Sequence, residues 1–176
     1  MTRPEANGVA KVRCTCGRVE LEAIGAPILS AACHCDDCQN GARLLAALPG
    51  APPVMDVYSG TQYVLYRKDR VTCSKGVELL RDYKLRKASG TNRVVASCCN
   101  AAMLVRFDGG LHWVSVYRGR YQAAAPTLEI RINTRFSPAG GERASDVPSY
   151  ASYPLRFVAK LVAAKIAMLL PGAGGR

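Results

Sequence analysis

Cysteine spacing constrains this chain more than any other feature of its sequence. Three of its eight cysteines fall within the stretch Cys33-His34-Cys35-Asp36-Asp37-Cys38, a C-x-C-x-x-C pattern. Thiolates spaced so closely suit zinc, which takes sulfur ligands at about 2.3 Å in a tetrahedral site. A C-x-C pair also has too little backbone between its thiols for an easy disulfide. Because three thiolates leave a tetrahedron incomplete, Cys33, Cys35 and Cys38 predict an open site of the catalytic kind.

A second group of cysteines is split along the chain. Cys14-Thr15-Cys16-Gly17 forms one half, and the adjacent pair Cys98-Cys99 forms the other. If the first hairpin lies beside the strand that ends near Ser97, the four sulfurs predict one closed, structural zinc site that contributes to folding. The alternative is that one of the adjacent pair is a buried, unligated thiol. Cys73 stands alone, and we interpret it as an unligated thiol.

The two histidines are weaker candidates for ligands. If the backbone around His34 is extended, its side chain alternates away from the metal held by its neighbours. We therefore interpret His34 as an orienting or surface residue and His112, beside Trp113, as a structural one.

Length and the N-terminal residues place further limits. A chain of 176 residues suits one domain with a real core. Met1–Arg13 lacks an apolar core of signal-peptide length, so we expect a cytoplasmic protein whose thiols stay reduced. In that compartment, clustered cysteines indicate metal ligands rather than disulfides.

The net charge of +11 is unevenly distributed. Residues 1–60 hold five Lys/Arg against six Asp/Glu, whereas residues 61–176 hold nineteen against seven. This basic part is either a solvated face or a surface for anions, such as a carboxylated small molecule or an acidic partner. With 7% aromatic residues and no nucleic-acid motif, we do not expect nucleic-acid binding.

The hydrophobic pattern predicts a mainly β fold of many short strands. Val19, Leu21 and Ala23 alternate with Glu20 and Glu22, a period of two with one buried face. A short helix is expected from Asp36 or Asp37 to about Leu48. The predicted strands are 9–13, 18–24, 28–32, 61–67, 77–85, 93–97, 102–107 and 111–117, with an extended run at 127–136.

The chain is expected to divide into a flexible N-terminus (1–8), a zinc-binding β domain (9–126) and a C-terminal extension (127–176). The extension contains a predicted helix at 155–170, between Pro154 and Pro171. Its apolar stretch is shorter than the roughly 20 residues of a transmembrane helix and is interrupted by Lys160 and Lys165. We expect it to pack on the domain or on a second subunit in a homodimer, with a membrane-surface role as the alternative.

Two motifs together resemble those of the glutathione-dependent formaldehyde-activating family, which includes centromere-protein-V-like proteins. They are Cys14-Thr15-Cys16-Gly17-x-Val19 and Cys33-His34-Cys35-x-x-Cys38-Gln39. The resemblance covers about residues 9–118. The sequences Cys-Asp-Asp-Cys-Gln and Cys-Cys-Asn are most similar to those of a divergent, uncharacterised bacterial branch of this family. The resemblance implies a β-tent fold with two zinc sites. Carried over, Cys14 and Cys16 are structural ligands, and Cys33, Cys35 and Cys38 are catalytic ones.

The late motif departs from the family pattern. The family has C-x-x-C-G there, whereas this chain has Ser97-Cys98-Cys99-Asn100-Ala101. Cys98 either substitutes for the first cysteine, or the site has three thiolates and another ligand. Residues 119–176, with the C-terminal helix, lie outside the resemblance.

Two hypotheses for function follow. The resemblance implies a carbon–sulfur lyase that acts on glutathione, or another thiol, and formaldehyde or a related aldehyde. The alternative is a non-enzymatic, zinc-stabilised binding module that engages a partner through its basic face and C-terminal helix.

Overall fold

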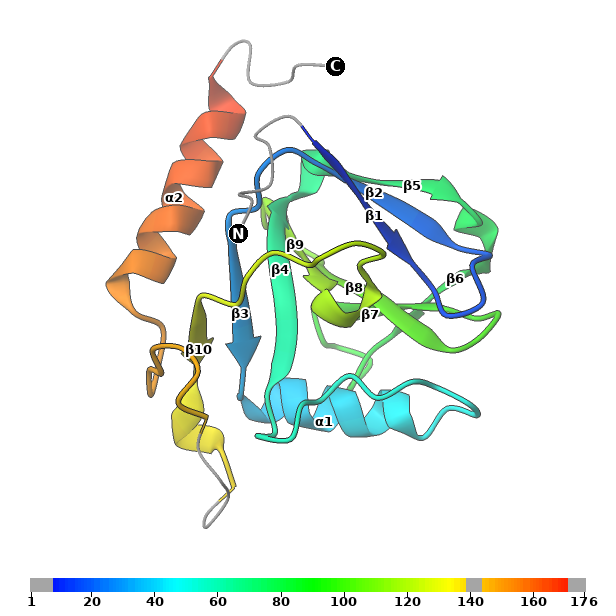
Figure 1. Ribbon diagram of the computed structural model, residues 1–176, viewed down its shortest axis with the longest axis horizontal. Coiled ribbons are helices and arrows are strands. Elements are labelled where there is room, and N and C mark those ends of the chain that lie inside the picture. Colours follow the sequence, from blue (N-terminus) through cyan, green and yellow to red (C-terminus); the bar gives the residue numbers. More distant parts are fainter. Residues whose placement is uncertain (1–7, 139–143, 171–176) are drawn as a thin grey trace.

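The computed structural model describes residues 8–138 and 144–170, and these fold into two β-sheets and two α-helices (Figure 1). The described part contains ten strands, so the prediction of a mainly β fold is confirmed. Apart from Gly8, the predicted flexible N-terminus (1–8) lies outside the described residues.

The helices and most strands occur where the hydrophobic pattern predicts them. The short helix α1 spans Asp36–Ala46, and the C-terminal helix α2 spans Leu155–Leu169. The strands are β1 (Val9–Arg13), β2 (Glu20–Ile24), β3 (Leu29–Cys33), β4 (Thr61–Arg67), β5 (Val71–Lys75), β6 (Leu80–Tyr83), β7 (Thr91–Ala96), β8 (Ala101–Phe107), β9 (Trp113–Tyr117) and β10 (Ile130–Ile132).

Three stretches differ from the prediction. The predicted strand at 77–85 begins with a 3₁₀ turn at Val77–Leu79 and contains only β6. Strand β5 was not predicted, because Thr72-Cys73-Ser74 lacks apolar alternation; it lies at the edge of a sheet, where only one face needs burying. The predicted extended run at 127–136 contains only three strand residues and then a 3₁₀ turn at Thr134–Phe136.

The smaller sheet has the strand order β1-β2-β5, and the larger has β10-β3-β4-β9-β8-β7-β6. Every pair of described strands is antiparallel except β10 and β3, which are parallel. After β9 the chain crosses back over the molecule before it forms β10, and a crossover of this kind can deliver a parallel strand.

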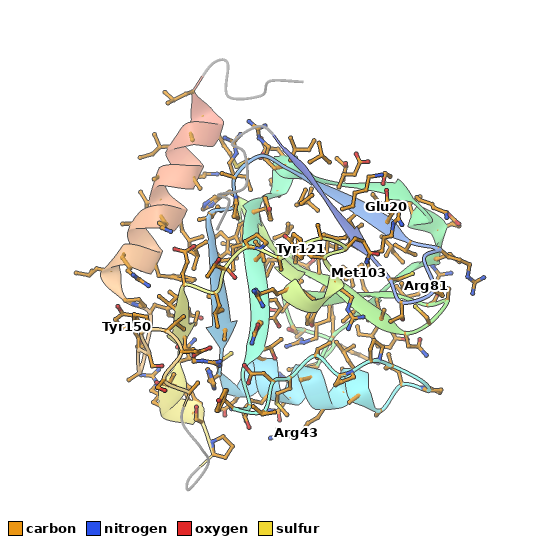
Figure 2. All side chains as sticks on the ribbon, viewed as in Figure 1. Glu20, Arg43, Arg81, Met103, Tyr121 and Tyr150 are labelled. Atoms are coloured by element: carbon orange, nitrogen blue, oxygen red, sulfur yellow. The ribbon has the colours of Figure 1, made fainter. Side chains whose placement is uncertain are left out.

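The small sheet packs against one face of the large sheet. Val64 and Tyr66 of β4 point into the layer between the sheets, where they join Leu21 of β2 in one buried cluster. Met103, labelled in Figure 2, is fully buried in the same layer. This layer holds the N-terminal hairpin, and therefore Cys14, against the large sheet.

The opposite face of the large sheet is covered by the two helices. Because strand side chains alternate, Tyr63 and Leu65 of β4 point to this face, where Leu45 of α1 and Phe157 of α2 pack beside them. His112 Nε2 lies 2.7 Å from the carbonyl oxygen of Leu161, which ties α2 to the chain before β9. This gives His112 the structural position expected of it.

The outer face of α2 is apolar and exposed. Phe157 is its one buried residue, whereas Leu155, Val158, Val162, Ile166 and Leu169 are all exposed. Neither described helix is both long enough and apolar enough to span a bilayer.

Candidate metal centres

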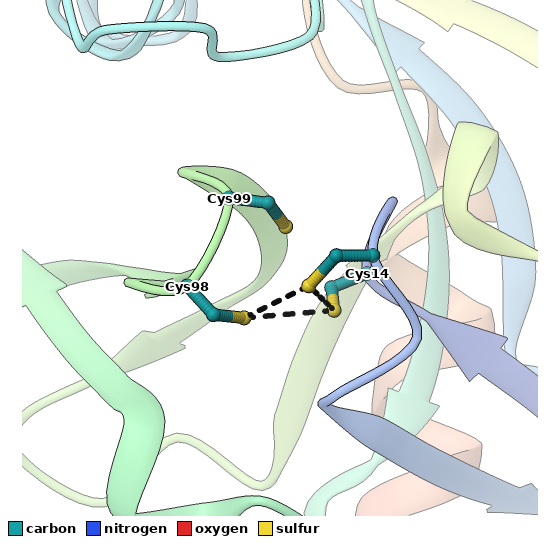
Figure 3. A group of neighbouring side chains, drawn as sticks. Cys14, Cys98 and Cys99 are labelled. Atoms are coloured by element: carbon teal, nitrogen blue, oxygen red, sulfur yellow. Dashed lines mark hydrogen bonds between the residues drawn. The ribbon is translucent and has the colours of Figure 1, made fainter.

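Cys14, Cys16, Cys98 and Cys99 meet where the N-terminal hairpin contacts the turn between β7 and β8. Their Sγ atoms all lie within 4.8 Å of one another. Cys14 Sγ is 3.6 Å from Cys16 Sγ and 3.8 Å from Cys98 Sγ, and Figure 3 shows the labelled residues converging. The predicted meeting of these four cysteines is therefore present in the fold.

The spacing of these sulfurs fits zinc. Ligands at about 2.3 Å in a tetrahedron stand roughly 3.8 Å apart, close to the distances between Cys14 and its neighbours. Adjacent cysteines would point to opposite sides of a strand, but Cys98 and Cys99 lie in a tight turn, where the Cys99 N–H donates to the Ala96 carbonyl. Asn100 completes the turn in the left-handed region, with φ 53°.

The first cluster favours a thiolate at Cys16. The backbone N–H of Arg18 and the thiol of Cys98 lower the pKa of Cys16 to about 6. Burial and hydrogen bonding to its neighbours raise the pKa of Cys98 to about 12. A bound cation would displace the remaining thiol protons, which makes metal binding dependent on pH.

The second cluster forms where β3 ends and α1 begins. Cys33 is the last residue of β3, Cys35 is the N-cap of α1, and Cys38 lies in the first helical turn. Cys33 Sγ is 3.4 Å from Cys35 Sγ, and all three Sγ atoms lie within 4.8 Å of one another. In the described part of the chain, no fourth histidine, cysteine or carboxylate joins this group.

The helix N-terminus stabilises negative charge at Cys35. Thiol donors from Cys33 and Cys38, followed by the backbone N–H groups of Cys38 and Asp37, lower the pKa of Cys35 to about 3. The neighbouring thiolate raises the pKa of Cys33 to about 11, and that of Cys38 also rises. Within the cluster, a thiolate is therefore favoured at Cys35.

Two further side chains contact these sulfurs, and sequence reasoning missed both. The Tyr63 hydroxyl, from β4, donates to Cys38 Sγ at 3.8 Å. Asn133 Nδ2 donates to Cys33 Sγ at 3.5 Å, from a residue with φ 58° directly after β10. Neither lies near the cysteines in sequence, and only the pairing of β3 with β4 and β10 brings them together.

His34 points away from the cluster, into a buried network of charges. Its Nε2 lies 3.3 Å from Arg131 Nη1, and its Nδ1 lies 3.1 Å from the Ser137 hydroxyl. Arg131 itself pairs with Asp56 and Asp146, each at 2.9 Å. Burial, and then the Arg131 charge, lower the pKa of His34. His34 therefore supports the segment between Cys33 and Cys35 from the opposite side.

Cys73 belongs to neither group of cysteines in the described residues. Its thiol donates to the Lys75 carbonyl at 3.2 Å, and burial raises its pKa. This position agrees with its interpretation as an unligated thiol.

A cavity of about 480 Å³ opens beside the second cluster. Cys33, Cys35 and Cys38 form part of its wall, together with residues of the large sheet and of α2. A small molecule in this cavity would have direct access to the three sulfurs.

Comparison with known proteins agrees with the N-terminal motifs. Residues 9–50 match the family described as "Glutathione-dependent formaldehyde-activating enzyme". This stretch contains Cys14, Cys16, Cys33, Cys35 and Cys38, so it carries the sequence signature of that family, as the resemblance predicted. Cys98, Cys99 and the C-terminal helix lie outside the match.

The chain matches no curated protein. A crystal structure of a Rhodobacter sphaeroides protein has 17% sequence identity and a TM-score of 0.47, covering 66% of this chain and 91% of that one.

Proposed function

We propose that this protein is a zinc-dependent carbon–sulfur lyase that promotes the reversible addition of a thiol to an aldehyde, with glutathione and formaldehyde as the pair that the matched family's description names. One observation carries the proposal. Three sulfurs, Cys33, Cys35 and Cys38, converge on the wall of a cavity, and no fourth protein ligand joins them in the described residues. Such a donor set suits a metal that keeps one position for an incoming ligand.

Zinc held by these cysteines would supply a Lewis acid for a carbonyl oxygen and lower the pKa of a bound thiol. In the addition, a sulfur–carbon bond forms as the carbonyl π bond opens, and the thiol proton ends on the new hydroxyl oxygen. No oxidant or reductant is required. Three thiolates and one zinc carry a net charge of −1, which weakens the Lewis acid. The hydrogen bonds that Tyr63 and Asn133 donate to Cys38 Sγ and Cys33 Sγ withdraw negative charge from these sulfurs and so partly restore the Lewis acidity.

The first cluster has a separate role in this proposal. Cys14, Cys16, Cys98 and Cys99 would hold a second, closed zinc that fastens the hairpin to the large sheet. Both sites need reduced thiols, which suits the cytoplasm.

The proposal is tested by following thiol–aldehyde exchange by NMR, because the reaction also proceeds without protein. The zinc-loaded protein should accelerate exchange between glutathione and formaldehyde above the spontaneous rate. Cys38→Ala should abolish the acceleration and lower the zinc content by one equivalent, while Cys73→Ala should change neither. Exchange at the spontaneous rate with zinc-loaded protein would exclude a lyase that acts on glutathione and formaldehyde.

The exposed apolar face of α2 favours a second candidate, a binding module that docks a partner or a second copy of the chain. Analytical ultracentrifugation of the wild type and of Val162→Asp tests the homodimer. Association that is lost in Val162→Asp would support it, and a wild type that sediments as a monomer at all concentrations would exclude self-association.

A further inference from the structure

The cavity beside the second cluster has mostly apolar walls. It lies between the inner face of the large sheet, the start of α1 and the inner side of α2. The apolar residues that line it include Leu65, Val105, Phe107, Trp113, Phe157 and Leu161. Cavities of this size and character hold small molecules, and the few polar groups in their walls decide which ones.

Among the described residues that line this wall, Arg93 is the cationic one. It lies on β7, its exposed fraction is 2%, and its Nη2 donates to the backbone carbonyl of Asp37. Nη1 is buried and has no hydrogen-bond partner in the described part of the protein. No carboxylate among the described residues pairs with Arg93 either. Asp37 is the acidic residue among the described residues of the wall; its side chain is 60% exposed and lies 4.0 Å from Arg86.

Arg131 is buried as deeply as Arg93 and shows what is missing. Arg131, also 2% exposed, has two carboxylates, Asp56 and Asp146, around its guanidinium. A buried cation without such a partner is costly, so an unpaired guanidinium at the wall of a cavity indicates an anionic ligand. Arginine also matches the fork geometry of a carboxylate.

The position of Arg93 is closely defined. Its guanidinium packs against Gly41 of α1 so tightly that an added Cβ at residue 41 would stand 1.9 Å from Arg93 Nε. It makes no hydrogen bond to the sulfurs of Cys33, Cys35 or Cys38, which contact one another, Tyr63 and Asn133 instead.

We infer that this cavity binds a small monocarboxylate with a hydrophobic body, and that Arg93 pairs with its carboxylate. The single charge and the apolar body of this ligand are inferred from the cavity alone. The further statement that the ligand carries the reacting thiol or aldehyde rests on the proposed function. Glutathione has two carboxylates and an ammonium group. Most of these charges would face apolar walls, so it fits this cavity less well than an aryl or branched-alkyl thiol acid.

The test uses the zinc-loaded full chain and three probes in isothermal titration calorimetry. The probes are 3-phenylpropanoate, its uncharged amide, and 2-mercapto-3-phenylpropanoate, which adds a thiol. We expect the carboxylate to bind at least tenfold more tightly than the amide. Arg93→Met should remove this preference, and Arg43→Met, which alters an exposed arginine on α1, should keep it.

The thiol probe separates this inference from the proposed function. It should bind more tightly than 3-phenylpropanoate and than glutathione, and Cys38→Ser should remove the gain that the thiol provides. Equal binding of acid and amide, or tighter binding of glutathione, would overturn the inference even if the protein accelerates thiol addition. Loss of zinc in Arg93→Met with an unchanged acid preference would also overturn it, because Arg93 would then only balance the thiolate charge.

Discussion

Cys14 and Cys98 are 84 residues apart in sequence, yet their sulfur atoms are 3.8 Å apart in the fold. One belongs to the small sheet's hairpin and the other to a turn of the large sheet. A metal held between them would join two sheets that are otherwise connected by apolar packing.

Cys98→Ser should therefore lower both the zinc content of the protein and its free energy of unfolding. Loss of one ligand from a closed site should remove one zinc equivalent, measured by elemental analysis. Loss of a structural metal is among the most damaging single changes, so we expect a fall of about 4 kcal/mol or more in the free energy of unfolding. This corresponds to a melting temperature lower by roughly 8–16 °C. Cys73→Ser is the control and should keep both values; equal losses in the two variants would contradict a metal at Cys98.

Tyr63→Phe should weaken metal binding at the second cluster alone. The variant removes the hydroxyl that donates to Cys38 Sγ, and loss of such outer partners typically lowers metal affinity about tenfold or more. Competition with a chromophoric chelator measures the affinity. Tyr66→Phe changes the same strand on its opposite face and should leave the affinity unaltered. An unchanged affinity in Tyr63→Phe would show that this hydroxyl does not support the site.

Gly41→Ala should disturb Arg93 although alanine favours helices. The substitution gains about 1 kcal/mol of helix propensity, but its Cβ overlaps the Arg93 guanidinium, and overpacking costs about 1–3 kcal/mol. We expect a net destabilisation of about 1 kcal/mol by chemical denaturation, with weaker binding of 3-phenylpropanoate. Gly90→Ala meets no atom within 4 Å and should lack both effects. A Gly41→Ala protein that is stabilised and binds normally would contradict this packing.

Arg131→Met should be strongly destabilising, because Asp56 would lose its cation within a largely buried network. Breaking a buried pair from one side costs about 3–5 kcal/mol. Arg106→Met removes a surface pair with Asp82 and should cost about 1 kcal/mol or less. Comparable values for the two variants, from denaturant titrations, would contradict the importance of the buried network.

The same network predicts a pH dependence. Burial raises the pKa of Asp56, but hydrogen bonds from Arg131, Gln62 and Gly60 outweigh it and hold the pKa below its usual value. Because the folded-state pKa is lowered, the contribution to stability is present above the unfolded-state value of about 3.9 and disappears as the pH falls through the folded-state value.

Asp56→Asn should therefore be less stable than the wild type at pH 7, and the two stability curves should converge below about pH 4. The difference between the two proteins is informative even though acid also releases metal from the thiolates, since this release affects both. Curves that run parallel from pH 7 to pH 3, measured by denaturant midpoints, would exclude the linkage.

Sequence reasoning predicted the elements whose pattern is local. The alternation of Leu21 and Ala23 predicted β2, and the C-x-C-x-x-C spacing predicted the grouping of three sulfurs. It failed where partners are decided by sheet order. Asn133 reaches Cys33 only because β10 pairs with β3 in parallel, and the burial of Arg93 against α1 depends on packing that no local pattern shows.

The strand pairing at this edge has a practical consequence. Residues 127–138, beyond the family's recognisable stretch, shield β3 from solvent and supply the amide that contacts Cys33. A chain trimmed to residues 9–50 would lose β4 as well as β10, so both edges of β3 would be unpaired beside the three cysteines and open to pairing with another chain. Such a fragment would be a poor substitute for the whole chain in any assay.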